Sequence, residues 1–176
     1  MATYQIGDKA IDKNGKIFEV ESIKEQDFGS GPASFFVMKP CFDYDYNEDY
    51  RFYVPVNNAN NILHKIMKKE EAIALIDEIP SLEEYPETTP RERKLQYQVL
   101  VSTGNRKDIC RIIKFLISYR EKRKLINKPF SEFDARILKS LIEMLRNEIS
   151  ISLDIPVDEV SAFIESRIGS SYFNEI

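Results

Sequence analysis

Short apolar runs alternate with turn residues through the first third of the chain, a pattern typical of a β-sheet. The predicted strands cover residues 4–11, 16–23, 34–39 and 50–56. Asn14 and Gly15 separate the first two runs, and both residues tolerate the positive φ that a tight hairpin requires. Short strands at this spacing predict a small barrel or a curled sheet.

The apolar spacing changes to that of amphipathic helices in the rest of the chain. The predicted helices cover residues 68–79, 91–102 and 105–125, followed by one that begins after Ser131 and one that begins at Pro156. Gly104 is expected to end a helix in the left-handed conformation. Asn105 and Ser131 are expected to cap the next two helices, because an aspartate follows each of them three residues later. Pro156 suits the first position of the last helix.

Residues 81–90 contain two prolines and few apolar side chains, which predicts a linker between two domains. The expected organisation is therefore a β domain over residues 1–66, a helix with the linker over residues 67–90, and a helical domain over residues 91–176. The fold class that follows is α+β. Of 176 residues, 43% are hydrophobic and 31% are charged, proportions typical of a folded globular protein.

The distribution of charge along the chain is uneven. Residues 90–128 contain 12 lysines and arginines against 3 acidic residues, whereas acidic residues are in excess before and after this segment. An acidic first part and a basic middle suggest two partners of opposite charge. The alternative is that the lysines and arginines line solvated helix faces.

The sequence offers few groups for catalysis or for binding a metal. The single histidine, His64, has no base or nucleophile partner that the sequence assigns, and Cys41 and Cys110 fall in different predicted domains. No close pair of zinc ligands and no glycine-rich phosphate loop is present. We therefore expect a protein that is not an enzyme, with no catalytic residue, metal site, cofactor or small-molecule substrate.

Two absences in the sequence bear on location. No apolar run approaches the roughly 20 residues that span a bilayer, and the first residues lack the apolar stretch of a signal peptide. We therefore expect a cytoplasmic protein with no membrane partner.

The segment of residues 43–49 imitates the start of a calcium-binding loop, with Asp43, Asp45 and Asn47 at alternate positions. The sixth position of such a loop is glycine and the twelfth is glutamate, but Glu48 and Val54 stand there. The segment is therefore interpreted as a solvated acidic hairpin tip.

Two basic clusters lie at predicted helix ends. Lys122, Arg123 and Lys124 follow one another at the end of a helix, where cations complement the helix dipole. Arg91, Arg93 and Lys94 stand at the beginning of a helix, where the dipole disfavours them. The second set is therefore the more informative one, and both sets together could span the phosphates of a nucleic acid.

The order of several short motifs resembles the CarD/CdnL family of bacterial transcription regulators. In the β domain these are Ile6-Gly-Asp-Lys-Ala-Ile11, Asn14-Gly-Lys-Ile17, Val20-Glu-Ser-Ile23 and Tyr53-Val-Pro-Val-Asn-Asn-Ala59. In the helical domain they are Ser102-Thr-Gly-Asn105, the run from Ser131 to Leu138, and Leu145 with Glu148-Ile149. The resemblance extends over residues 4–165.

The resemblance implies an SH3/Tudor-like β-barrel followed by a helical bundle. In the family, the barrel docks on the β subunit of RNA polymerase by adding a strand to its β1 lobe. The helical domain then contacts promoter DNA at the upstream edge of the transcription bubble and stabilises the open complex. Tethering to the polymerase raises the local concentration, so weak DNA contacts suffice.

Carried over to this chain, the docking edge corresponds to residues 24–28 and 50–54. The residues expected at the polymerase interface are Gln26, Asp27, Phe28, Arg51 and Tyr53. The residues expected to contact DNA are Pro90, Arg91, Arg93, Lys94, Lys122, Arg123, Lys124 and Arg136.

The chain departs from the family at the tryptophan that wedges into the minor groove, because it contains no tryptophan. Alignment back from Gly104 puts Pro90 at that position. Proline can act as a minor-groove wedge, but it also suits the first turn of a helix. A protein-binding module that makes no DNA contact is therefore the alternative function.

Overall fold

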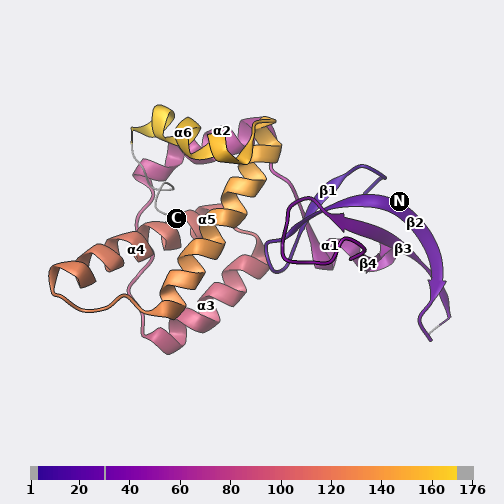
Figure 1. Cartoon of the computed structure of the whole chain (residues 1–176), viewed down its shortest axis with the longest axis horizontal. Helices are drawn as coiled ribbons and strands as arrows, with labels where there is room; N and C mark the ends of the chain where they lie inside the picture. Colours follow the sequence, from indigo (N-terminus) through magenta and orange to yellow (C-terminus); the bar gives the residue numbers. More distant parts are fainter. Residues whose placement is uncertain (1–3, 30, 170–176) are drawn as a thin grey trace. The chain divides into compact units, whose positions relative to one another are not determined.

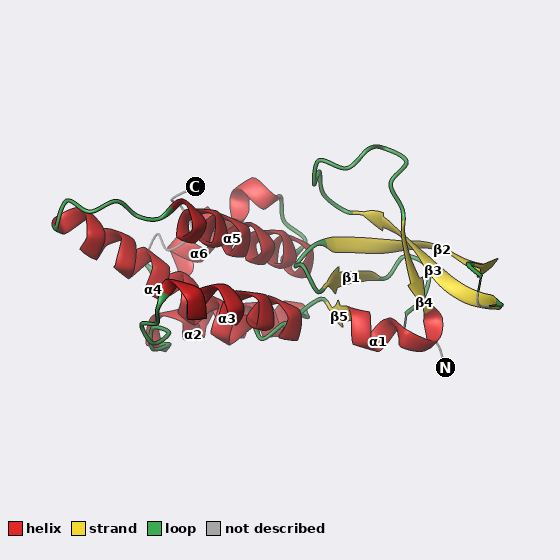
Figure 2. Cartoon of the chain, turned by 90° about the horizontal axis from the view of Figure 1, so that it is seen from below, coloured by secondary structure: helices red, strands yellow, loops and turns green. Residues whose placement is uncertain are grey.

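The structure is a computed structural model that describes residues 4–29 and 31–169 (Figure 1). The chain divides into two compact units, Met1–Ile66 and Met67–Ile176. The first is built on a β-sheet and the second is helical, so the fold is α+β, as the sequence predicts (Figure 2).

The sheet has five antiparallel strands in the order β4-β3-β2-β1-β5. The strands are β1 (Lys9–Asp12), β2 (Ile17–Asp27), β3 (Pro32–Pro40), β4 (Phe52–Pro55) and β5 (Leu63–Lys65). The turn at Gly15, where φ is 79°, connects β1 to β2 as predicted. The pairing of β2 with β3 shifts between Val20 and Ser22, and such a bulge increases the local bend of a strand.

The sheet does not close into the expected barrel. β4 and β5 are its two edges, and β5 pairs only with β1. The sequence analysis missed β5, because three residues are too short to show an alternating pattern. A 3-10 turn (η1, Val56–Asn58) and a single helical turn (α1, Ala59–Ile62) lead from β4 to β5.

The larger hydrophobic cluster of the first unit lies on one face of this sheet. Phe36, Met38 and Val54 are fully buried there, together with Phe18 and Val20 of β2. Tyr4 meets the edge of the Phe36 ring at 6.0 Å between centroids. The alternation of side chains along β3 and β4 therefore sends their intervening residues to the opposite face.

Within its described residues, the second unit contains five helices of two or more turns. They are α2 (Lys69–Glu78), α3 (Pro90–Thr103), α4 (Arg106–Leu125), α5 (Glu132–Leu153) and α6 (Val157–Ile168), with a 3-10 turn after α2 (η2, Ile79–Ser81). Gly104 ends α3 at a φ of 65°, and the side chains of Asn105 and Ser131 cap α4 and α5 as predicted. Pro156 lies one position earlier than expected, at the N-cap of α6.

Helix α5 is the centre of the helical unit and packs against α2, α4 and α6. Its buried stripe includes Leu138, Ile142, Leu145 and Ile149. Helix α2 therefore belongs to the helical unit, and the chain divides at residues 66 and 67 rather than at residues 81–90. No helix in the described part of the chain is both long and apolar enough to cross a membrane.

A buried carboxylate holds the first residue of the helical unit. Glu148 on α5 is fully buried; it accepts hydrogen bonds from the backbone N–H of Met67 at 2.9 Å and from Arg106 at 2.9 and 3.1 Å. The hydroxyl of Ser152 donates to the Met67 carbonyl at 2.8 Å. Residues preceding α2 are thus fixed to α5 by polar contacts as well as by packing.

Candidate functional site

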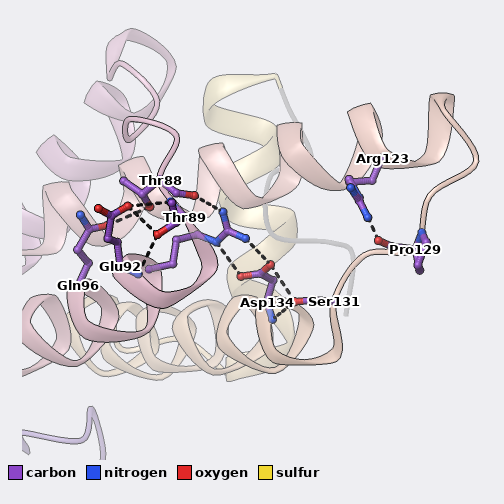
Figure 3. A network of polar contacts seen from close by, with 9 residues as sticks. Thr88, Thr89, Glu92, Gln96, Arg123, Pro129, Ser131 and Asp134 are labelled. Atoms are coloured by element: carbon purple, nitrogen blue, oxygen red, sulfur yellow. Dashed lines mark hydrogen bonds and ion pairs between the residues drawn. The ribbon is translucent and has the colours of Figure 1, made fainter.

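A buried ion pair joins the beginning of α3 to the beginning of α5. The Arg93 guanidinium donates to both carboxylate oxygens of Asp134, at 3.2 and 3.1 Å, and to the carbonyl of Thr88 at 2.6 Å (Figure 3). Arg93 is 4% exposed and Asp134 is 1% exposed. Burial lowers the pKa of Arg93, but the hydrogen bonds that Arg93 donates to Asp134 and the negative charge of that carboxylate together outweigh burial and hold the pKa above its usual value.

This pair corrects one predicted DNA contact. Arg93 was expected to face DNA because a cation at a helix start opposes the dipole. Its charge is instead balanced inside the protein by Asp134, so the guanidinium is not on the surface. Thr89 and Glu92 cap the same helix reciprocally, and the Glu92 carboxylate adds negative charge where the dipole favours it (Figure 3).

A single tyrosine connects this beginning of α3 to the end of α4. The Arg93 guanidinium lies 5.1 Å from the centroid of the Tyr119 ring, and the Arg123 guanidinium lies 5.9 Å from it. Arg123 also donates to the carbonyl of Pro129 at 3.1 Å (Figure 3). One residue of each basic cluster, Arg93 and Arg123, 30 residues apart in sequence, therefore lies beside the same ring, at the end of the unit where α3 begins and α4 ends.

Many of the basic residues predicted from the charge excess have partners inside the unit. Arg106 pairs with Glu148, Lys107 with Glu78 at 2.8 Å, and Arg111 with Asp108 at 3.1 Å. Lys114 donates to three carbonyl oxygens at and after the end of α2, among them those of Ile79 and Pro80. The first half of α4 thus uses its cations to hold the bundle together.

Five exposed cations of residues 90–128 lie near the beginning of α3 or at and after the end of α4. We call this surface the basic end; within the described chain its members make no ion pair and are exposed. They are Arg91, Lys94, Lys122, Lys124 and Lys128. Arg123 is half-buried beside them, held by Tyr119 and Pro129.

Two further residues of the predicted DNA site lie near this end. Pro90 is exposed and is the first residue of α3, the helix-start role that its sequence position allowed. Arg136 is exposed on α5, two residues after Asp134. Two residues correspond to about 200° around a helix, so Arg136 points away from the side of α5 that holds Arg93.

Two residues of the predicted polymerase site, Phe28 and Tyr53, belong to an aromatic cluster on the outer face of the sheet. The Phe28 ring meets the edge of Phe35 at 5.0 Å and of Tyr53 at 5.7 Å between centroids. Phe28 is 60% exposed and Tyr53 is 37% exposed. Phe35 was not predicted, although its alternation with the buried Phe36 would have assigned it to this face.

The other three residues of that prediction have structural partners or lie apart. The Asp27 carboxylate accepts from the N–H groups of Gly29 and Gly31, at 2.7 and 3.0 Å, and so closes the β2–β3 turn. Arg51 binds Glu21 through two bonds of 2.7 and 2.8 Å, and these hold the pKa of Glu21 below its usual value. Gln26 is exposed on β2.

The two segments expected to form one docking edge lie on different sides of the sheet. β4 is an edge strand, whereas the end of β2 beyond Val20 extends past its pairing with β1. Residues 24–27 therefore pair with β3 on one side only, and their unpaired side faces away from β3 and β4. Only one of the two segments can be the edge to which a partner adds a strand.

The acidic segment of residues 43–49 is more ordered than the expected hairpin tip. Its carboxylates are exposed, as predicted, but the Tyr44 hydroxyl accepts a hydrogen bond from the Ile17 N–H at 2.9 Å. Tyr46 stacks on Tyr50 with centroids 4.0 Å apart. No group of three or more His, Cys, Asp or Glu side chains in the described residues could hold a metal ion.

Neither cysteine has the surroundings of a nucleophile. Burial raises the pKa of Cys110 to about 12 and that of Cys41 to about 11, so both thiols are protonated at neutral pH. His64 lies on β5, where it pairs with Ile11.

Comparison with known protein families yields no matching family model, and comparison with curated proteins yields no match either.

The difference between Arg93 and Arg91 is testable by unfolding. Arg93→Met leaves the Asp134 carboxylate buried without its counter-ion, so we expect a loss of about 3 kcal/mol of unfolding free energy in urea. Arg91→Met removes an exposed charge on the same helix and is expected to change stability by less than about 0.5 kcal/mol. Equal losses of unfolding free energy in the two variants would contradict the burial of Arg93 beside Asp134.

Proposed function

We propose that this chain is a CarD-like transcription regulator that docks on the β subunit of bacterial RNA polymerase through its sheet and contacts promoter DNA through its basic end. The protein acts by binding, and DNA near the upstream edge of the bubble is its second partner. The proposal includes an SH3/Tudor-like ancestry for the sheet, which is open in this chain.

The observation that carries the DNA contact is the separation of the cations into two classes. Those in the first half of α4 are neutralised by internal partners, whereas those of the basic end have none in the described chain. Charges that face solvent without counter-ions attract phosphates over a Debye length and release counter-ions when they bind.

The polymerase contact is supported by the sequence motifs of the β domain and by the aromatic cluster of Phe28, Phe35 and Tyr53. A solvent-exposed aromatic group beside an unpaired strand suits a protein partner, because aromatic side chains supply much of the energy of such interfaces. Added backbone pairing would set the register of the partner.

One observation favours the alternative, a protein-binding helical unit that makes no DNA contact. Leu95 and Val99 lie four residues apart on α3 and are 60% and 58% exposed. Residues at this spacing share a helix face, and an exposed apolar face suits a protein more than a phosphate backbone.

The salt dependence of binding to duplex DNA tests the basic end. Lys122→Gln combined with Lys124→Gln removes two phosphate contacts, so the slope of log K against log salt should become shallower by about 2. Fluorescence anisotropy with the full chain measures this slope. The matched control is Lys13→Gln with Lys69→Gln, two exposed lysines outside the basic end. A slope changed equally in both variants, or no binding by the unaltered chain, would favour the protein-binding alternative.

A pull-down of the polymerase β1-lobe fragment tests the sheet. Phe28→Ser removes the centre of the exposed aromatic cluster, and we expect the fragment to be lost from the pull-down. Ile6→Ser changes a residue of similar exposure, 64%, in the same unit and should leave the pull-down intact. Retention by the Phe28→Ser chain would show that the docking surface lies elsewhere.

A further inference from the structure

The end of α4 carries the most exposed large apolar side chain of the described residues. Leu125 is 83% exposed, and Ile126, which follows it, is 58% exposed. In both views of the molecule, this end of α4 extends beyond the other helices of its unit (Figures 1 and 2). Neither side chain contributes to the core of the helical unit.

Hydrogen bonds fix the backbone that presents these two side chains. Asn127 adopts a φ of 51°, and its N–H donates to the carbonyl of Lys124 at 3.1 Å. The N–H of Lys128 donates to the carbonyl of Arg123 at 2.9 Å. This pair of bonds is the Schellman ending of a helix. The Arg123 side chain adds a third bond to Pro129, so the turn is held from both sides.

Cations flank the apolar pair in sequence. Lys122 and Lys124 precede it and Lys128 follows it, and all three are exposed without an ion pair in the described chain. An apolar tip with cations on both sides is complementary to a surface on which anionic groups flank an apolar interior. Duplex DNA has this character where phosphates flank a stack of bases, and an inserted leucine or isoleucine can open that stack.

We propose that Leu125 and Ile126 insert between base pairs in the minor groove while the lysines beside them bind the flanking phosphates. This inference rests on the proposed DNA contact, and it assigns the insertion to the end of α4 instead of Pro90 at the start of α3. A rigid turn loses little conformational freedom on insertion, which favours binding. Flexible pyrimidine–purine steps are the preferred sites, because they unstack at the lowest cost.

An anionic membrane resembles duplex DNA in being anionic at its surface and apolar inside. Stable attachment to a bilayer usually combines a cationic patch with a large apolar face or a lipid chain, whereas two side chains suffice to open a base step. The size of the apolar tip therefore favours DNA.

The test uses the full chain and a short duplex that carries 2-aminopurine at a central TA step. Unstacking raises the fluorescence of this base, so the unaltered chain should raise it. Leu125→Ser with Ile126→Ser should abolish the rise and weaken binding about tenfold. Its salt slope should stay unchanged, because no charge is altered. The control, Leu95→Ser with Val99→Ser, removes an equally apolar exposed pair on α3 and should keep the rise.

The outcomes separate this inference from the proposed function. Salt-dependent binding by the unaltered chain without a fluorescence rise would overturn the insertion and leave the DNA contact standing. No binding to any duplex would overturn both. Retention of the rise by the Leu125→Ser, Ile126→Ser chain would overturn the assignment of the insertion to α4. Flotation with phosphatidylglycerol–phosphatidylcholine vesicles that depends on Leu125 and Ile126, without any fluorescence rise, would identify the tip as a lipid contact and overturn the inference.

Discussion

The buried contact between Arg93 and Asp134 determines what the helical unit displays. It fixes the first turn of α3 against the first turn of α5, across 41 residues of sequence. The Tyr119 ring lies beside the same guanidinium and beside that of Arg123, so this tyrosine links the contact to the last turns of α4. Arg93 and Arg123 thus connect the beginnings of α3 and α5 to the last turns of α4.

The same contact explains how a helix with few apolar residues stays attached to the bundle. Helix α3 buries Arg93, Tyr97 and Leu100 and exposes Leu95 and Val99. Tyr97 stacks on Phe133 next to Asp134, with centroids 6.1 Å apart. A charged pair and an aromatic pair therefore replace the aliphatic stripe that holds α5, and the free cations of α3 remain at its surface.

Local signals in the sequence were sufficient for most of the secondary structure. The hairpin at Gly15, the caps at Asn105 and Ser131 and the end of α3 at Gly104 each depend on neighbouring residues, and these predictions are confirmed. Strand β5 forms only because it pairs with β1, which lies far away in sequence. The sheet is open because its edge strands, β4 and β5, do not pair with each other. A short stretch of sequence predicts neither the strand β5 nor the open sheet.

The candidate site also contains residues that the sequence predicted and residues that it did not. Charge counting found the basic segment, but it could not separate Arg106 or Lys107, which are paired, from Lys122 or Lys124, which are not. The assignment of Arg93 to DNA was wrong because its partner, Asp134, had a sufficient local explanation as the capping partner of Ser131. Leu125 and Ile126 were missed because a helical pattern does not reveal which apolar residues lie beyond the bundle.

The central claim is that one end of the helical unit binds duplex DNA. An NMR titration of the isotope-labelled full chain with a short duplex tests it most directly. The account predicts that the shifted amides cluster at residues 90–95 and 120–128, with no shifts along β1 or α6. Shifts confined to the sheet, or to the exposed face of α3 around Val99, would contradict it.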